Sequence, residues 1–117
     1  MTNKNLKLAQ EKFLKGDKET AKKICLNLIH QKLDTNVFNF LGIIELSENN
    51  YLESLKHFHK SLKLNQNNVK ALNNIGNTLI KKNKYKDNLL IKSIIYRKLI
   101  KNVINNLLLL SLRFFCR

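Results

Sequence analysis

The sequence predicts an all-α protein built from antiparallel helix pairs. It contains no proline, and its glycines stand alone at Gly16, Gly42 and Gly76. Little of the chain shows the alternation of apolar and polar residues that a half-buried strand needs, whereas apolar residues recur at helical spacings. Residues 39–51 also have an echo in residues 73–85, 34 positions later, which indicates a repeated structural unit.

The first helix pair is predicted from the N-terminal part of the chain. Apolar side chains at Leu6, Ala9 and Phe13 precede a turn at residues 15–18, and a second apolar series follows over residues 21–29. This stretch is a degenerate version of the unit that comes next along the chain.

The second helix pair has the clearest pattern. Apolar residues recur at helical spacings over residues 35–46, and Asp34 or Thr35 can cap the first free amides. Asn50 with Glu53 has the spacing of a capping box that opens a partner helix. The buried stripe expected on that helix is Leu52, Leu55, Phe58, Leu62 and Leu64. The polar residues 65–68 then predict a turn.

The third pair is predicted to begin with a helix over residues 69–80. Its apolar side would be Leu72, Ile75, Gly76 and Leu79, and a turn is expected at residues 81–84. Tyr85 would then open the partner helix. We expect Gly42 and Gly76 to be buried and to let each first helix approach its partner closely.

This periodicity resembles the tetratricopeptide repeat (TPR), a unit of two antiparallel helices. The second unit supplies the residues that the family has at its signature positions, namely Phe38, Leu41, Gly42, Tyr51, Ser54, Phe58 and Ser61. The third supplies Leu72, Ile75, Gly76 and Tyr85 and then departs from the pattern. The resemblance implies a right-handed solenoid, with a degenerate repeat at 1–34, a second at 35–68 and a third at 69–102 whose second helix is atypical.

The stretch after Tyr85 keeps a helical pattern but loses the repeat signature. The C-terminal residues 103–117 are apolar nearly all round. Two interpretations are open: a helical extension that caps the solenoid, or an out-of-frame tail on a truncated fragment of a larger TPR protein. Self-association through this tail is a further expectation.

The composition of the chain limits the kinds of partner that it can bind. The 117 residues carry a formal net charge of +14, and the positive charges are spread along the chain. Such a spread is typical of a solvated basic surface, although it would also suit an acidic partner. The chain has no apolar run long enough to span a membrane and no signal peptide at its start, so a cytoplasmic location is expected.

The residue types that carry catalysis or bind metal do not gather in any recognisable motif. Cys25 and Cys116 lack a metal or disulfide spacing, and His57 and His59 point to different sides of one helix. We expect His57 to face solvent and His59 to lie beside the buried stripe. Neither an enzymatic activity nor a cofactor or metal is therefore predicted.

The resemblance implies that a ligand binds on the concave surface lined by the first helix of each repeat. Projected onto the repeat, Phe40 is one of the positions expected to be exposed there. The binding residues predicted on this surface are Asn39, Lys70, Asn73, Asn74, Asn77 and Lys81. Asparagine amides can pair with a peptide backbone whatever its sequence, and lysines favour acidic residues.

The sequence therefore favours a non-catalytic scaffold that binds a protein or peptide segment, which the lysines would suit if it is acidic. The alternatives are a basic helical protein that binds nucleic acid or an anionic membrane, and the scaffold part of a larger transferase. The even spread of charge argues against nucleic acid as the main partner.

Overall fold

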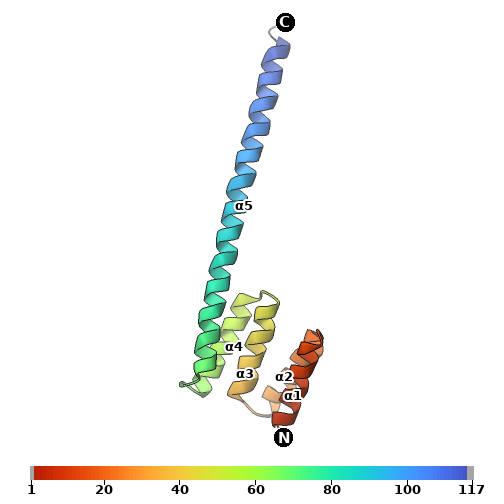
Figure 1. Ribbon diagram of the computed structural model, residues 1–117, viewed down its shortest axis with the longest axis vertical. Coiled ribbons are helices and arrows are strands. Elements are labelled where there is room, and N and C mark those ends of the chain that lie inside the picture. The colour runs from red at the N-terminus through yellow and green to blue at the C-terminus, as the bar shows by residue number, and fades with distance from the viewer. Residues whose placement is uncertain (1, 116–117) are drawn as a thin grey trace. The chain divides into compact units, whose positions relative to one another are not determined.

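The computed structural model describes residues 2–115, and all the regular secondary structure in that range is helical (Figure 1). The predicted all-α class is confirmed. Contacts divide the chain after Lys81 into two compact units. The helices, in chain order, are α1 (Thr2–Leu14), α2 (Lys18–Gln31), α3 (Thr35–Ser47), α4 (Tyr51–Leu64) and α5 (Val69–Phe115).

The first helix pair ends and restarts at a glycine followed by an aspartate. Gly16 has a φ of +89°, a left-handed conformation that glycine adopts without steric cost, and it terminates α1. The carboxylate of Asp17 then caps α2 by accepting a hydrogen bond of 3.1 Å from the amide of Thr20. The predicted turn at residues 15–18 is therefore confirmed, and α1 packs against α2.

The second helix pair begins where the sequence predicts it. Asp34 caps α3 by accepting from the amides of Asn36 (2.7 Å) and Val37 (3.3 Å). Asn50 is the residue before α4, but its side chain makes no capping hydrogen bond, so the predicted capping box is wrong. Asn49 instead takes a left-handed φ of 62°, a conformation that asparagine tolerates better than most residues, and so shapes the turn.

The core of the first unit lies between the packed helices α1 to α4. Its largest fully buried side chains include Phe58, Leu41 and Ile44, and the ring of Phe13 meets that of Phe40 edge to face at 5.6 Å. The expected stripe of α4 is partly wrong, because Leu52 is 67% exposed while Ser54, Phe58 and Ser61 are buried. Ser54 and Ser61, two of the repeat's signature positions, lie on the buried side of α4 with Phe58, and Leu52 and Leu64 lie outside it.

Both serines of α4 hydrogen-bond to α3. The hydroxyl of Ser54 donates to the carbonyl oxygen of Gly42 over 2.8 Å, and the hydroxyl of Ser61 donates to the carbonyl oxygen of Thr35 over 2.8 Å. Thr35 returns a hydrogen bond from its own hydroxyl to the carbonyl oxygen of Ser61 at 2.9 Å. These bonds satisfy buried hydroxyls and hold the two helices close.

The residue before α5 is hydrogen-bonded to the same contact between α3 and α4. The side-chain amide of Asn68 donates to the hydroxyl oxygens of Thr35 (3.1 Å) and Ser61 (3.2 Å), and its carbonyl oxygen accepts from the amide of Ala71 (3.2 Å). Asn68 thus caps α5 and links it to α3 and α4. The predicted turn at residues 65–68 is confirmed.

From Val69 onward the structure differs from the sequence prediction. No turn occurs at residues 81–84 and no separate helix opens at Tyr85, because α5 continues to Phe115. The stretch 81–84 holds three lysines and one asparagine, and lysine is a good helix former. Without a partner helix, Gly76 is exposed with open space where a Cβ would stand, so its predicted burial is wrong.

Gly42 occupies the position that the sequence predicts. It is buried in α3 and faces the ring of Phe58 in α4. A Cβ at this position would lie only 2.6 Å from Cδ1 and 2.8 Å from Cζ of Phe58. Glycine therefore permits the close approach of α3 and α4.

Candidate functional site

Four of the predicted binding residues form an exposed row on the first part of α5, which we call the polar ridge. The polar ridge consists of Lys70, Asn73, Asn77 and Lys81, and each is solvent-exposed. Their spacings of three, four and four residues bring them to one side of the helix. Ala71 and Thr78, which are fully buried, mark the adjacent and buried side of this part of α5.

The remaining two asparagines bind each other. The side-chain amide of Asn74 in α5 donates to the side-chain oxygen of Asn39 in α3 over 3.1 Å. Asn39 is 9% exposed, so its expected exposure is wrong, and Phe40 is likewise buried. The contact arises because α5 packs against α3 at this point. Asn39 and Asn74 therefore position the polar ridge relative to α3.

An ionic cluster centred on the buried Glu45, which the sequence analysis missed, joins α2, α3 and the residue that precedes α4. Glu45 is 3% exposed and pairs with Lys22 of α2. Its second carboxylate oxygen accepts from the side-chain amide of Asn50 at 2.8 Å. Glu45, the one charged residue in the sequence of α3, was the available signal, because a buried charge needs a partner.

The cluster sets the ionisation of its members. Burial alone would raise the pKa of Glu45, but the hydrogen bonds from Lys22 and Asn50 and the charge of Lys22 outweigh it and hold that pKa below its ordinary value. The pKa of Lys22 is raised, mainly by its bond to Glu45. Both groups are thus held in their charged forms.

His57 lies beside this cluster, not in solvent as predicted. It is half-buried, its ring stacks on that of Phe38 with the ring centroids 6.3 Å apart, and its Nδ1 has no hydrogen-bond partner among residues 2–115. Burial lowers its pKa and favours the neutral ring. His59, predicted to lie beside the buried stripe, is exposed. The buried side of α4 is formed by Ser54, Phe58 and Ser61, and the helical spacing places His57 nearer to that side than His59.

Acid is expected to destabilise the first unit through Glu45. A carboxyl whose pKa is lower when folded stabilises the fold above its ordinary value of 4.5, and this contribution is lost as pH falls through the folded pKa. Glu45→Gln should therefore show a flatter loss of stability below pH 4.5 than the wild type. Urea unfolding at a series of pH values measures the difference.

The matched control is Glu53→Gln on α4. The pKa of Glu53 is also lowered, by its hydrogen bond from Lys56, but Glu53 is exposed and solvent screens the interaction. Its substitution should change the pH dependence less. Parallel curves for wild type and Glu45→Gln would contradict the role assigned to Glu45.

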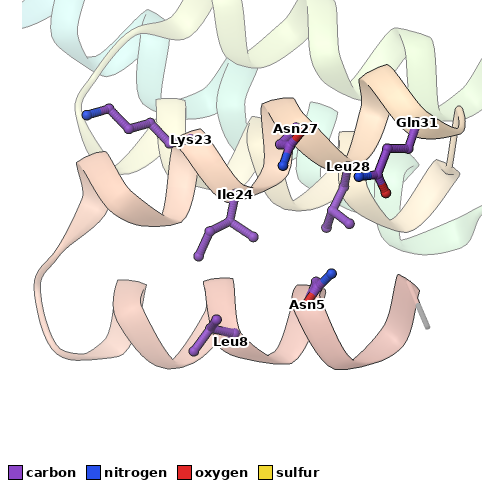
Figure 2. Close-up of a pocket in the computed structure, with 7 residues that line it drawn as sticks. All are labelled: Asn5, Leu8, Lys23, Ile24, Asn27, Leu28 and Gln31. Carbon is purple, nitrogen blue, oxygen red and sulfur yellow. The ribbon is translucent and has the colours of Figure 1, made fainter.

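A shallow cavity of about 320 Å³ lies between α1 and α2 (Figure 2). Ile24 points from α2 toward α1, where Leu8 lies, and Lys23 and Gln31 are further along α2 on either side of Ile24 (Figure 2). Its lining residues are Asn5, Leu8, Lys23, Ile24, Asn27, Leu28 and Gln31. This lining combines apolar side chains, three amides and one lysine, so the cavity offers apolar contact and hydrogen bonding.

The described residues contain no group of three or more histidine, cysteine or acidic side chains placed to hold a metal ion. Cys25 is buried in the core, and burial raises the pKa of its thiol to about 12, so it is protonated at neutral pH. Cys116 lies outside the described residues. Across residues 2–115, no helix combines the length and apolar character needed to cross a bilayer.

No protein-family model matches the chain, and a search of curated proteins finds no significant match.

Proposed function

We propose that the chain is a TPR-type scaffold that binds an extended, acidic protein segment along the polar ridge of α5. The observation that carries this proposal is the row Lys70, Asn73, Asn77 and Lys81, four exposed side chains on one side of the first part of α5. Hydrogen bonds from Asn68 and Asn74 hold this part of the chain to α3 and α4. Cations at both ends and amides between them suit a ligand with negative charges and free backbone groups.

The packing of the helix pairs supports a TPR-type arrangement. Gly42 meets Phe58 where α3 and α4 approach, and the small residues Ser54 and Ser61 lie on the same side of α4. Ala9 and Ala21 are fully buried at the corresponding places of the first pair. On this proposal residues 1–34 and 35–68 are complete repeats, and α5 provides the first helix of the third repeat.

The spacing of the lysines defines the ligand more closely. Lys70 and Lys81 are eleven residues apart, which is about 16 Å along a helix. An extended peptide covers that distance in about five residues. The preferred ligand therefore has two acidic residues four or five positions apart, and its intervening backbone groups pair with the amides of Asn73 and Asn77.

Asn77→Ala is expected to weaken peptide binding by about 1 kcal/mol, the usual net value of one hydrogen bond. Asn77 is exposed, so the fold should be unchanged. Lys70→Ala and Lys81→Ala should weaken binding to acidic peptides alone, and this loss should fade with added salt. Calorimetry with peptides that differ in the spacing of their acidic residues measures all three effects.

Asn83→Ala is the matched control, because Asn83 lies on the same helix about 120° away from the centre of the polar ridge. It should bind like the wild type. Equal affinities for wild type, Asn77→Ala and both lysine variants across the peptide panel would exclude the polar ridge as the ligand site.

A further inference from the structure

The second unit consists of the part of α5 that begins at Lys82, and it presents an uncovered apolar stripe. The members of the apolar stripe are spaced by three and four residues, the pattern of one helix face. Each is more than half exposed. The apolar stripe consists of Tyr96, Leu99, Ile100, Val103, Ile104 and Leu107.

Over residues 98–105, the other side of this helix is polar and basic. Lys98, Lys101, Asn102 and Asn105 occupy the side opposite the apolar stripe. Between residues 82 and 114 the sequence has a single acidic residue, Asp87. The basic residues in the same stretch are Lys82, Lys84, Lys86, Lys92, Arg97, Lys98, Lys101 and Arg113.

We propose that this part of α5 docks lengthwise on an anionic lipid surface. An amphipathic helix with a basic polar face lies in the plane of the membrane interface, with its apolar face among the acyl chains. Anionic headgroups then neutralise the lysines, which contribute about 1 kcal/mol each when they lie near the surface. The positive charge of the helix thus identifies an anionic surface as the partner. The apolar stripe determines how deeply the helix enters the membrane interface.

Two features favour lipid over a second copy of the same helix. Pairing two copies would bring two strongly positive helices together, whereas an anionic bilayer attracts them. In addition, Leu108, Leu109 and Leu112 extend the apolar surface beyond the apolar stripe, and all three are more than half exposed. A partner helix covers one face, whereas lipid can surround the apolar end.

Co-sedimentation of the full chain with vesicles tests the proposal. Vesicles of phosphatidylcholine with about one-third phosphatidylglycerol should bind the protein at least tenfold more strongly than vesicles of pure phosphatidylcholine. Binding to the anionic vesicles should weaken as salt is added. Equal binding to both compositions, or none to either, would overturn the proposal.

Two neighbouring residues provide a matched pair of variants. Ile104→Glu and Asn105→Glu change the net charge equally, but only Ile104 belongs to the apolar stripe. The added charge should weaken binding about fivefold in each, and the lost apolar contact should weaken Ile104→Glu by at least a further tenfold. Equal binding by the two variants would overturn the proposal.

The orientation of the helix can be read by fluorescence, because the chain contains no tryptophan. Tyr96→Trp places a reporter on the apolar stripe, and Asn105→Trp places one on the opposite side of the helix. Anionic vesicles should shift the emission of the first to shorter wavelength and leave the second nearly unchanged.

Sedimentation equilibrium without vesicles completes the test by measuring the oligomeric state. A stable dimer that fails to bind vesicles would overturn the proposal in favour of self-association.

Discussion

Phe58→Ala is expected to destabilise the first unit by about 3–5 kcal/mol, the usual range for deleting a buried aromatic ring. Phe58 is fully buried, and its ring faces Gly42 where α3 and α4 approach. The cavity left by the ring would have little prospect of closing, because hydrogen bonds from Ser54 and Ser61 hold the two helices on either side of it. Since small proteins are stable by only about 5–15 kcal/mol, much of the fold would be lost.

Urea unfolding followed by circular dichroism measures this loss, and Phe114→Ala is its matched control. Phe114 is 88% exposed, so the same change of side chain should alter stability by no more than about 0.5 kcal/mol. Similar losses for both variants would show that Phe58 does not occupy the core.

Gly42→Leu is expected to cost about 1–3 kcal/mol or more through overpacking. Even the first carbon of the new side chain would stand 2.6 Å from Cδ1 of Phe58, far inside van der Waals contact. Relief requires α4 to move away from α3, which would break the hydrogen bond from Ser54 to the carbonyl of Gly42. Thermal unfolding should therefore occur at a lower temperature than in the wild type.

The same substitution at the other glycine of the sequence echo should have the opposite effect. Gly76 has open space around its Cβ position, and leucine is a better helix former than glycine. Gly76→Leu should then stabilise α5 by about 0.5–1 kcal/mol. Equal destabilisation by Gly42→Leu and Gly76→Leu would contradict the exposed position of Gly76 and indicate that another part of the protein covers it.

The local signals in the sequence were sufficient for the first four helices. The carboxylate of Asp34 marks the start of α3, and the polar residues 65–68 separate α4 from α5 as expected. These features depend on short-range hydrogen bonding that a few residues specify. The burial of Gly42 was also predictable, because the repeated glycine at Gly76 and the aromatic Phe58 indicated close packing of two helices.

The sequence did not reveal that the repeat of residues 39–51 in residues 73–85 is not matched by a second turn in the structure. Residues 81–84 match the turn of the second pair in position, but they lack a glycine or proline to break the helix. The periodic argument therefore outweighed the local one, and it was wrong. Gly76 shares its sequence context with Gly42, yet its surroundings depend on whether a partner helix follows.

The candidate site was likewise predictable where it depends on local spacing, and not where it depends on contacts between helices distant in sequence. The helical spacing of Lys70, Asn73 and Asn77 was enough to place them on one side of α5. The pairing of Asn39 with Asn74 and that of Glu45 with Lys22 depend on how helices distant in sequence approach each other. Periodicity alone does not contain that information.

The packing order of the first unit has a consequence for its folding kinetics. The main contacts join helices that are neighbours along the chain, α1 with α2, α2 with α3, and α3 with α4. Such a topology has a low contact order, because each step closes a short loop. Folding on a timescale of microseconds to milliseconds is therefore expected. It can also begin at any adjacent pair and spread in either direction, since no early contact must wait for distant parts of the chain to meet.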